Sequence, residues 1–311
     1  MKDFNPTLLK SLYIPPADSH KGQNGKVLLI GGSHLFHAST LWALEIASKI
    51  VDMVFYASVP ENNEIVQKNK ELFRNGIVIQ QKDIESYIEE AEAILIGPGM
   101  VRSDKSGIFN FQFSIFNLEE ILKIEDEGEQ TYFLTKYLLE KYPEKKWIID
   151  AGALQMMELE WLRQLNGNVI LTPHQGEFER IFNFQFPISN SQSKNNDSIY
   201  NDKAFISDMA KKYNCIILLK GETDIICSPE DCVQITGGNA GMTKGGTGDV
   251  LAGLVTALAS KNDLFLSACA GSYINKKAGE SLFRKVGYYF NASDLVNEVP
   301  VLMGEIVNDK Q

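Results

Sequence analysis

The sequence has few basic residues and no basic block. Its 311 residues contain 30 Lys and Arg against 40 Asp and Glu, which gives a formal net charge of −10 at pH 7. This balance argues against nucleic acid as the main partner. An anionic substrate must then be held by local groups, such as loop amides, a few lysines and a divalent cation.

Long apolar runs and closely spaced metal ligands are missing as well. The opening residues, MKDFNPTLLK, lack the apolar stretch of a secretory signal, and no run is long enough to span a membrane. The four cysteines show neither a CxxC spacing nor nearby histidines at zinc spacing; they are Cys215, Cys227, Cys232 and Cys269. We therefore expect a cytoplasmic protein with no membrane partner and with buried, reduced thiols.

What the sequence does contain is a regular alternation of strands and helices. Apolar residues at 44% and charged residues at 23% are ordinary for a soluble globular protein. Several expected strands are apolar along their whole length, which is typical of a mostly parallel sheet with helices on both faces. The strands are expected at residues 26–30, 52–57, 76–80, 93–96, 147–150, 169–172, 215–220, 223–227 and 232–235. We expect one α/β domain over residues 1–311, with no internal repeat and no linker.

Two stretches fit this alternation less well. Residues 103–145 contain four phenylalanines that suggest a buried face, an acidic stretch that we expect to be a solvated loop (125–130) and a helix at 131–141; the phenylalanines are Phe109, Phe111, Phe113 and Phe116. This stretch is a candidate surface or oligomer-contact insertion. Residues 186–200 are polar and predict a flexible surface loop. Later helices are expected at 202–213, 264–283 and 293–299.

The most informative stretch is GGNAGMTKGGTGDVLAGLVTALAS, residues 237–260. Gly245, Gly246 and Gly248 carry no Cβ, so the backbone can turn sharply and lie against a ligand. Apolar residues then recur at helical spacing, which places Asp249 in the first turn of a helix. The free amides and the positive dipole end of such a helix bind phosphate.

Asp249 at this position suits proton transfer better than anion binding, because a carboxylate repels phosphate. It would take a proton from a substrate hydroxyl that then attacks a phosphoryl group. The alternative is that Asp249 only caps the helix, since Asp is a favoured capping residue. Three glycines at this spacing favour phosphoryl chemistry.

Five loops are expected to meet at one edge of the sheet. Ligands bind in open α/β sheets at the carboxyl ends of the strands, and each of these loops follows a strand. The loops are residues 31–33, 97–99, 174–177, 220–224 and the glycine-rich loop. We expect one site built from all of them.

Charged residues in these loops have both a functional and a structural interpretation. Lys220 either offers a point charge to a phosphate or extends into solvent from the sheet edge. Glu177 either holds Mg²⁺ through water or pairs in a capping box with Thr172 or His174.

Asp150 and His174 each have two interpretations as well. Asp150 either holds a cation or simply ends a strand, and His174 either contacts a ligand or is structural. Hydride transfer has little support, because Gly31-Gly32 lacks the rest of a GxGxxG motif.

In this order, the motifs resemble the ADP- or ATP-dependent NAD(P)H-hydrate dehydratases of the ribokinase-like superfamily. The glycine-rich stretch combined with TPHxGE is specific to them, and we expect no epimerase domain, which many bacterial relatives carry. The matching stretches are KVLLIGGS (26–33), IGPGM (96–100), IIDAGAL (148–154), ILTPHQGEFERIF (170–182), LLKGETDII (218–226) and GGNAGMTKGGTGDVLAGL (237–254).

The resemblance implies repair of the S epimer of hydrated NADH or NADPH, in which water has added to the nicotinamide ring. In this family the terminal phosphoryl group of the nucleotide passes to the hydrate's hydroxyl, and elimination of phosphate restores the dihydronicotinamide. Asp249 matches the catalytic base. The amides of Gly246, Thr247 and Gly248 match the anion hole for the phosphoryl group.

The resemblance also implies the binding residues and partners. Contacts to the hydrate fall to Ser39, Gly99, His174 and Asp249. Contacts to ADP or ATP fall to Lys220, Gly221, Glu222, Thr223, Asp224, Asn239 and Gly248. Glu177 matches the residue that organises Mg²⁺ in the wider superfamily. A homotetramer is implied in addition, and the family's prokaryotic members favour ADP.

Two positions depart from the family pattern. Ala38-Ser39 stands where a Gly-Ala pair is usual, and Ser39 replaces an alanine whose backbone faces the hydrate. The family's DADAL reads DAGAL here, so Gly152 replaces the second aspartate. This puts any role of that carboxylate in doubt.

Two other functions remain to be weighed. A kinase of the same superfamily, acting on a hydroxymethylpyrimidine or thiazole alcohol, would use the same base and anion hole, but TPHQGE and KGETD favour the dehydratase. A catalytically inactive nucleotide-binding protein would be expected to lack the base or the intact glycine loop, and both are present.

Overall fold

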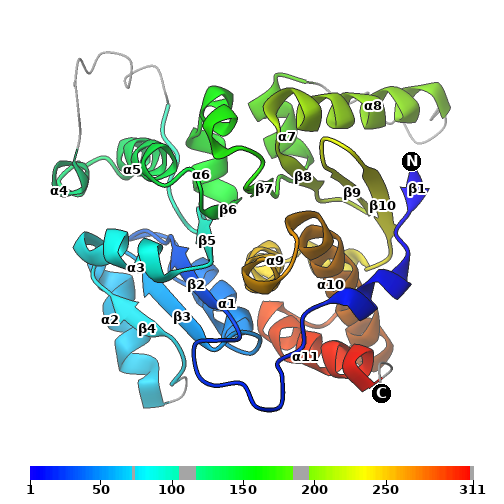
Figure 1. Cartoon of the computed structure of the whole chain (residues 1–311), viewed down its shortest axis with the longest axis horizontal. Coiled ribbons are helices and arrows are strands. Elements are labelled where there is room, and N and C mark those ends of the chain that lie inside the picture. Colours follow the sequence, from blue (N-terminus) through cyan, green and yellow to red (C-terminus); the bar gives the residue numbers. More distant parts are fainter. Residues whose placement is uncertain (72–73, 105–116, 185–195, 309–311) are drawn as a thin grey trace.

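The computed structural model describes residues 1–71, 74–104, 117–184 and 196–308. Ten strands form one sheet in the order β1-β10-β9-β8-β7-β6-β5-β2-β3-β4 (Figure 1). The strands are β1 (Lys2–Asp3), β2 (Lys26–Ile30), β3 (Met53–Ala57), β4 (Ile77–Ile79), β5 (Ala93–Ile96), β6 (Lys146–Ile149), β7 (Val169–Leu171), β8 (Ile216–Leu219), β9 (Thr223–Cys227) and β10 (Cys232–Thr236). Among these described strands only β9 runs antiparallel to its neighbours, so the mostly parallel sheet is confirmed.

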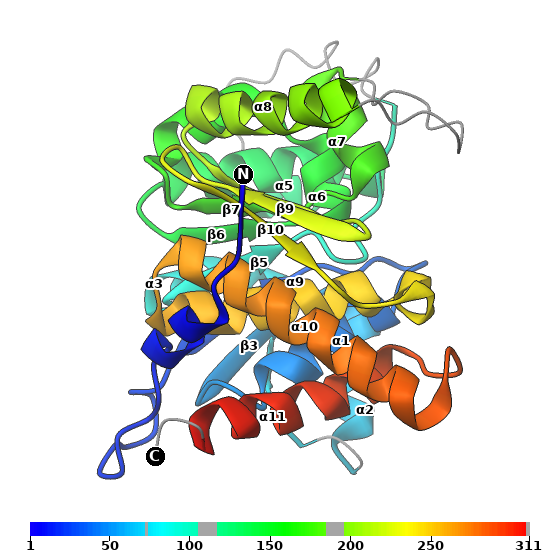
Figure 2. The ribbon, with the colours of Figure 1, turned by 90° about the vertical axis from the view of Figure 1, so that its right-hand side faces the viewer.

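Helices cover both faces of the sheet. One face carries α1 (Ala38–Ala47), α9 (Thr247–Lys261), α10 (Leu264–Val286) and α11 (Ala292–Asn308). The other carries α3 (Ile84–Glu90), α4 (Leu118–Ile121), α5 (Glu127–Lys141), α6 (Ala151–Met156), α7 (Gln175–Phe182), α8 (Asn196–Tyr213) and the 3-10 helix η5 (Leu159–Leu165). Figure 2 shows α7 and α8 above the sheet and α9, α10 and α11 below it. The remaining elements are α2 (Pro60–Lys68), η1 (Pro6–Ser11), η2 (Asn69–Glu71), η3 (Gln81–Asp83) and η6 (Ala240–Thr243).

The strands are apolar throughout because each contributes to two cores. In β2, Val27 and Leu29 point into the core under α1 and α9, while Leu28 and Ile30 point into the core under α3 and α5. All four are almost completely buried. Burial on both faces is what a continuous apolar strand predicts. Within the described ranges, no helix is long and apolar enough to cross a bilayer.

The strand order reverses between β2 and β5. From β2 the chain adds β3 and β4 on one side and then β5 to β8 on the other. The turns after β2 and β5 touch, because the Gly32 amide donates to the Pro98 carbonyl over 2.7 Å. A Cβ on Gly31 would lie 2.3 Å from that same oxygen, so this close approach requires glycine.

Three element boundaries differ from the expected ones. Residues 127–130 of the stretch expected to be a loop are helical, because Asp126 accepts from the Glu129 amide over 2.8 Å and caps α5, which begins at Glu127. Helix α8 begins at Asn196, inside the stretch expected to be a flexible loop, so part of this expectation is wrong. The polar composition of the stretch did not reveal the helix. Residues 185–195 lie outside the described residues.

Helix α11 is also longer than the expected 293–299. It runs through Pro300 to Asn308, because Leu302, Met303 and Ile306 continue the apolar stripe that packs on the first core. Of the candidate insertion at 103–145, residues 105–116, with the four phenylalanines, lie outside the described residues. Residues 127–141 form α5, which connects β5 to β6 and buries Leu134 and Leu138 in the second core.

The expectation of four reduced cysteines is wrong for one pair. Cys227 and Cys232 are directly opposite each other in the β9–β10 hairpin and form a disulfide, whereas Cys215 and Cys269 are free and buried. Their sequence spacing did not reveal the bond, because the pairing depends on the register of the hairpin.

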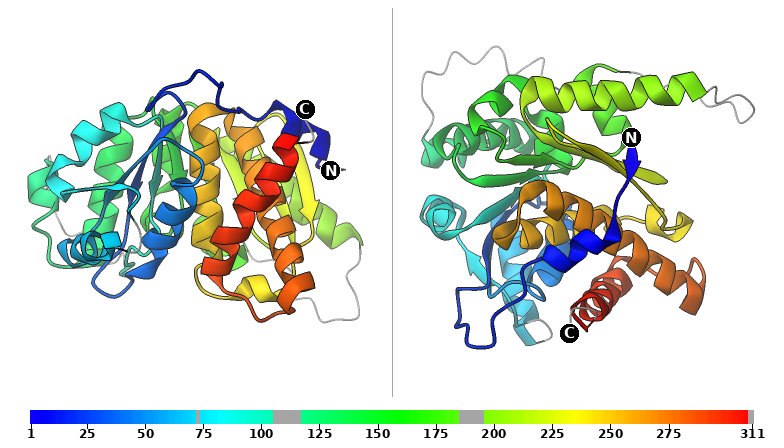
Figure 3. Two further views of the ribbon diagram at one scale, coloured as in Figure 1. Left: turned by 90° about the horizontal axis from the view of Figure 1, so that it is seen from below. Right: turned by 45° about the vertical axis from the view of Figure 1, so that its right-hand side comes forward.

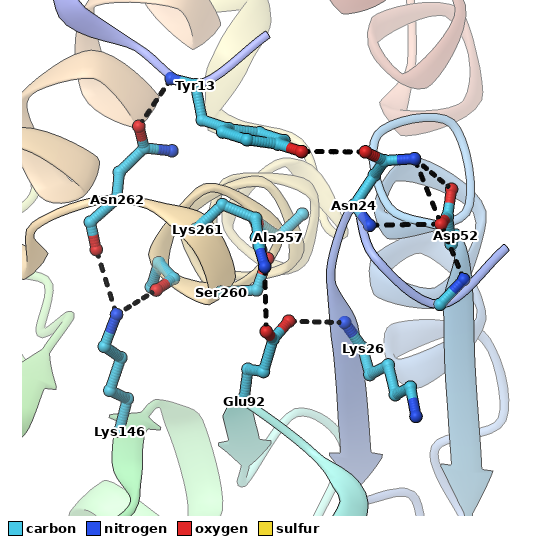
Figure 4. Close-up of polar contacts among 12 residues, drawn as sticks. Tyr13, Asn24, Lys26, Asp52, Glu92, Lys146, Ala257, Ser260, Lys261 and Asn262 are labelled. Atoms are coloured by element: carbon cyan, nitrogen blue, oxygen red, sulfur yellow. Dashed lines mark hydrogen bonds and ion pairs between the residues drawn. The ribbon is translucent and has the colours of Figure 1, made fainter. Parts of the chain in front are cut away.

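A network of hydrogen bonds and ion pairs surrounds the C-terminal end of α9, away from the glycine-rich loop (Figure 4). The ammonium of Lys146 donates to the carbonyls of Ala259 (2.8 Å) and Asn262 (3.0 Å). Glu92 accepts from the Lys261 ammonium over 2.9 Å and from the Lys26 amide over 3.0 Å. Cations at a helix C-terminus are favourable because they meet the negative end of its dipole.

The N-terminal segment is tied to the same place. The Tyr13 amide donates to Asn262 Oδ1 (2.7 Å), and the Tyr13 hydroxyl donates to Asn24 Oδ1 (2.8 Å). The Asn24 amide in turn donates to Asp52 over 3.1 Å. Before this point, η1 packs against α10 and α11, as the dark blue segment in Figure 3 shows.

Candidate active site

The glycine-rich loop brings the N-terminus of α9 to the carboxyl edge of the sheet. Gly246 precedes the helix with φ of +92°, a left-handed conformation, and a Cβ there would lie 2.4 Å from the Trp42 ring. No side chain caps this helix start, and in the described residues no acceptor is bonded to the amides of Gly248 and Asp249. The Thr247 amide, which the resemblance assigned to the anion hole with those of Gly246 and Gly248, instead donates to the Lys244 carbonyl over 3.4 Å. The free N–H groups of Gly248 and Asp249, at the positive end of the dipole, form an anion-binding site.

Asp249 lies beside these amides in a partly buried, negatively charged environment. Burial raises the pKa of its carboxyl to about 7, and the nearby carboxylates of Asp150 and Glu177 act in the same direction. The Lys220 ammonium and a hydrogen bond from Ser39 oppose the rise. A carboxylate with a pKa near neutrality is suited to general base catalysis.

Lys220 does not extend into solvent. It follows β8, its side chain is 19% exposed, and its ammonium lies 3.0 Å from Asp150 Oδ1. Burial disfavours the cation, but Asp150, Glu177 and Asp249 together raise the pKa of Lys220, so it stays charged. A Cβ on Gly248 would lie 3.6 Å from the Lys220 ammonium, which places this charge next to the anion-binding amides.

Asp150 does more than end its strand. Its buried carboxylate accepts hydrogen bonds from Lys220 and, over 2.8 Å, from the Thr172 hydroxyl. The ion pair joins the ends of β6 and β8, across β7.

His174 and Glu177 form a capping box at the start of α7. The Glu177 carboxylate accepts from the His174 amide over 2.9 Å, and the Glu177 amide donates to His174 Nδ1 over 3.3 Å. The other carboxylate oxygen of Glu177 accepts from Gln155 over 2.9 Å. The capping interpretation of Glu177 is confirmed, with His174 as its partner. His174 keeps a side chain that is 60% exposed.

Ser39 and Gly99 lie together on the other side of Asp249. A Cβ on Gly99, which has φ of +71°, would lie 3.2 Å from the Ser39 Cβ. The side chain of Ser39 reaches Asp249, a contact that the sequence did not predict. Asp249 therefore interacts with both Ser39 and Lys220.

Gly152, which departs from the family's aspartate, has a steric explanation. A Cβ at this position would lie 2.1 Å from the Met100 carbonyl oxygen, and the Gly152 amide donates to the Gly97 carbonyl over 3.2 Å. The chain that follows β5 thus occupies the space that a side chain at 152 would need.

A cavity of about 870 Å³ opens beside Gly248 and Lys220, which is large enough for a nucleotide. It is lined by nine of the residues that the sequence assigned to a site: His174, Lys220, Gly221, Glu222, Thr223, Asp224, Asn239, Thr247 and Gly248. The lining does not include Ser39, Gly99, Glu177, Gly246 or Asp249.

Two residues of α10 that the sequence did not single out, Asn275 and Lys276, also line the cavity. The Lys276 ammonium, which is buried, lies 3.1 Å from Asp224 and donates to the carbonyls of Gly221 (2.9 Å) and Glu222 (3.0 Å). Asp224 also accepts from the Ser272 hydroxyl over 2.7 Å, so its carboxylate shapes the loop. The sequence carried no clear signal for Lys276, because α10 contains other charged residues such as Lys277 and Glu280.

The carboxylates at the site do not form a metal cage. In the described ranges, no three His, Cys, Asp or Glu side chains are close enough together to hold a metal ion. Glu177 uses both of its oxygens for protein contacts, and Asp150 is paired with Lys220. Such a donor set fits a Mg²⁺ ion that is carried on nucleotide phosphates and reached through water.

Comparison with solved structures supports the fold. An ADP/ATP-dependent NAD(P)H-hydrate dehydratase from Bacillus subtilis, co-crystallised with ATP/Mg²⁺, superposes with a TM-score of 0.75 at 22% identity and covers 98% of both chains. A ribokinase-like superfamily protein from Enterococcus faecalis gives the same TM-score over 98% of this chain and 96% of its own. The fold is ribokinase-like, as expected.

Comparison of sequences supplies the family. The family model for NAD(P)H-hydrate dehydratase matches residues 27–301. The ADP-dependent (S)-NAD(P)H-hydrate dehydratase of Nitrosopumilus maritimus is 34% identical over 96% of this chain and 95% of its own length. The bifunctional NAD(P)H-hydrate repair enzyme Nnr of Methanocaldococcus jannaschii is also 34% identical, and the chain spans 50% of its length. The chain therefore belongs to the NAD(P)H-hydrate dehydratase family.

Proposed function

We propose that this protein dehydrates the S epimer of hydrated NADH or NADPH, with ADP or ATP as phosphoryl donor. The observation that carries the proposal is the position of Asp249. Its carboxyl has a pKa of about 7 and lies between the free amides of the α9 N-terminus and the Ser39–Gly99 surface. A base placed between a phosphate site and a second ligand surface suits phosphorylation of a hydroxyl.

The nucleotide occupies the 870 Å³ cavity with its phosphates at the Gly248 end. The free amides of Gly248 and Asp249 hold the terminal phosphoryl group, and the Lys220 ammonium balances its charge. Glu177 would be the residue that holds a Mg²⁺ ion at the phosphates, through water, and the ion would supply further charge neutralisation. Asp150 keeps Lys220 directed at this position.

The hydrate binds against Ser39, Gly99 and His174, with its hydroxyl toward Asp249. Asp249 takes the hydroxyl proton as the oxygen attacks the terminal phosphorus, and AMP or ADP leaves. Phosphate is then expelled from the ring and a proton is lost from the neighbouring ring carbon, which restores the double bond. The oxygen of the added water leaves in the phosphate, and phosphorylation turns a poor leaving group into a good one.

We further propose that the protein works in the cytoplasm and assembles as a homotetramer. Exposed apolar side chains support self-association; they include Leu35 (62% exposed), Phe36 (47%) and Tyr289 (92%). Light scattering on the purified protein tests the oligomer.

The direct test is an absorbance assay on hydrated NADH with Mg²⁺ and either ADP or ATP. The hydrate lacks the near-ultraviolet band of the dihydronicotinamide, so repair is seen as the return of that band. We expect a nucleotide-dependent rise that the Asp249→Asn variant loses and that Asp18→Asn, a matched change at an exposed aspartate, retains. A folded protein that binds nucleotide but gives no rise would rule out the dehydratase. A stable phosphorylated product from an alcohol substrate would support the kinase.

A further inference from the structure

Asn275, which lines the nucleotide cavity, has an amide oxygen without a hydrogen-bond partner among the described residues. It lies on α10, lines the cavity and is 5% exposed. Its Oδ1 is buried and accepts no hydrogen bond from any group in the described part of the chain. A buried polar atom without a partner is costly to the free protein, so such an atom at a ligand cavity needs an explanation.

Other polar side chains that line the cavity near Asn275 do have hydrogen-bond or ion-pair partners. Asn239 accepts from the Gly241 amide (2.9 Å) and donates to the Gly279 carbonyl (2.8 Å). Lys276, the next residue along α10, is bonded to Asp224 and to loop carbonyls. These contacts build the walls of the cavity, whereas the Asn275 amide contributes nothing to them.

The surroundings of Asn275 suit a flat aromatic ring. Met242 and Leu251 line the same cavity. Met242 packs against Gly279, since a Cβ there would lie 2.2 Å from its sulfur, and Gly279 is one helical turn beyond Asn275 on the same face of α10. Leu251 lies one turn of α9 beyond Gly248, where the phosphates bind. The cavity therefore combines anion-binding amides at Gly248 with apolar side chains of Met242 and Leu251 and the Asn275 amide.

We propose that Asn275 recognises the adenine base of the nucleotide and makes the site selective for adenine. Its Oδ1 accepts from the adenine N6 amino group, and its Nδ2 donates to N7, the pairing by which asparagine recognises adenine elsewhere. Guanine and hypoxanthine present an oxygen in place of the amino group, which would leave Oδ1 unpaired. This inference rests on the proposed function, because it takes the cavity to be the nucleotide site.

The test compares binding of Mg–ADP and Mg–IDP to the full chain by calorimetry. Wild type should bind ADP at least about tenfold more tightly than IDP, the lower range for a bidentate amide–adenine pair. Asn275→Leu, which keeps the size and removes both polar atoms, should reduce the ratio to less than about threefold, mainly by weakening ADP. Asn297→Leu, the same change at an exposed site on α11, should leave the ratio at the wild-type value.

Two further readouts separate recognition from damage to the fold. Asn275→Leu removes an unpaired buried group, so the free protein should melt about 2 °C higher. An ADP analogue that has carbon in place of N7 should bind wild type several-fold more weakly than ADP, and the variant equally well. Asn275→Ala is measured in the same way, so that the comparison does not depend on one variant.

An ADP-to-IDP ratio that is the same in wild type and in the Asn275 variants would overturn the proposal. The binding measurement contains no hydrate, so its outcome is independent of catalysis. A wild type that prefers ADP but repairs no hydrate would contradict the dehydratase and leave the adenine contact standing. Repair activity together with an ADP-to-IDP ratio that the Asn275 variants leave unchanged would support the dehydratase and contradict the adenine contact.

Discussion

The two ends of α9 are built in opposite ways. At its N-terminus, Gly246 provides no cap, two amides have no described partner, and Asp249 has a pKa of about 7 beside two other carboxylates. At its C-terminus the Leu258 carbonyl accepts from both nitrogens of Asn262 (3.1 and 2.8 Å), and Lys146 bonds the next carbonyl. Figure 4 shows how fully this second end is paired.

The two ends of α9 therefore contribute differently to the stability of the folded protein. At the catalytic end, unbonded amides and a partly buried carboxyl are less favourable in the folded protein than they would be in water. They persist because the rest of the fold fixes their positions. Groups at the opposite end lower the free energy of the folded state. Replacements at the two ends should therefore have opposite effects on stability and activity.

The largest effect is expected from Asp249→Asn. Removal of the base should lower kcat at least about a hundredfold, the lower range for general base catalysis. The pKa of about 7 in the folded protein exceeds the ordinary aspartate pKa of 3.8, so ionisation of Asp249 destabilises the fold as pH rises from about 4 to 7. At pH 8 the variant should then be more stable than wild type, by up to about 4 kcal/mol, and at pH 4 the two should be alike.

Urea unfolding at both pH values, beside the exposed Asp18→Asn control, checks this prediction. A variant that is less stable than wild type at pH 8 would mean that the Asp249 carboxylate stabilises the fold, and the contrast between the two ends of α9 would fail.

Asp150→Asn should change the pH profile more than the maximal rate. Because Asp249 acts as a base in its ionised form, kcat/KM should rise with pH through an apparent pKa of about 7 in wild type. Asp150 raises that pKa and also holds Lys220, while Glu177 faces the same group from α7. Removing the Asp150 charge should lower the apparent pKa by roughly one unit. A reduced kcat with an unmoved profile would contradict this role.

The loops of the site could be predicted because each is encoded locally. Lys26–Ile30 is apolar throughout and ends at two glycines, and it forms β2 with the expected bounds. The same pairing of an apolar strand with a polar or glycine turn located the edge where Gly99, His174, Lys220 and Asp249 lie. Parallel strands then bring those turns together.

The partners of these residues could not be predicted, because they depend on strand order. Lys220 and Asp150 are 70 residues apart and meet only because β6 and β8 flank β7. Asn275 carried no local signal, since an asparagine within a helix is ordinary, and its lack of a partner exists only in the packed structure. The disulfide was missed for the same reason.

Lys146→Met should destabilise the protein and leave catalysis unchanged. The change removes two hydrogen bonds from a cation to carbonyls at the end of α9, and its cost should be about 1–3 kcal/mol in urea unfolding. Burial lowers the pKa of Lys146, so part of this loss is offset by relief of desolvation. Lys68→Met, at an exposed ion pair, should change stability by less than about 0.5 kcal/mol. A kcat that falls with Lys146→Met would show that the two ends are coupled.

Tyr13→Phe tests the smallest contact in the comparison. It removes one hydroxyl, which donates to Asn24 Oδ1 over 2.8 Å, and leaves that oxygen without this donor. The main-chain bond from residue 13 to Asn262 remains, so the expected cost is about 1 kcal/mol with kcat and KM unchanged. In a double-mutant cycle with Lys146→Met, the loss in the double variant should be smaller than the sum of the two single losses if Asn262 couples the contacts, because Asn262 accepts from the Tyr13 amide and its carbonyl accepts from Lys146. Additive losses would mean that the network consists of independent contacts, and the stable end of α9 would then be a sum of parts.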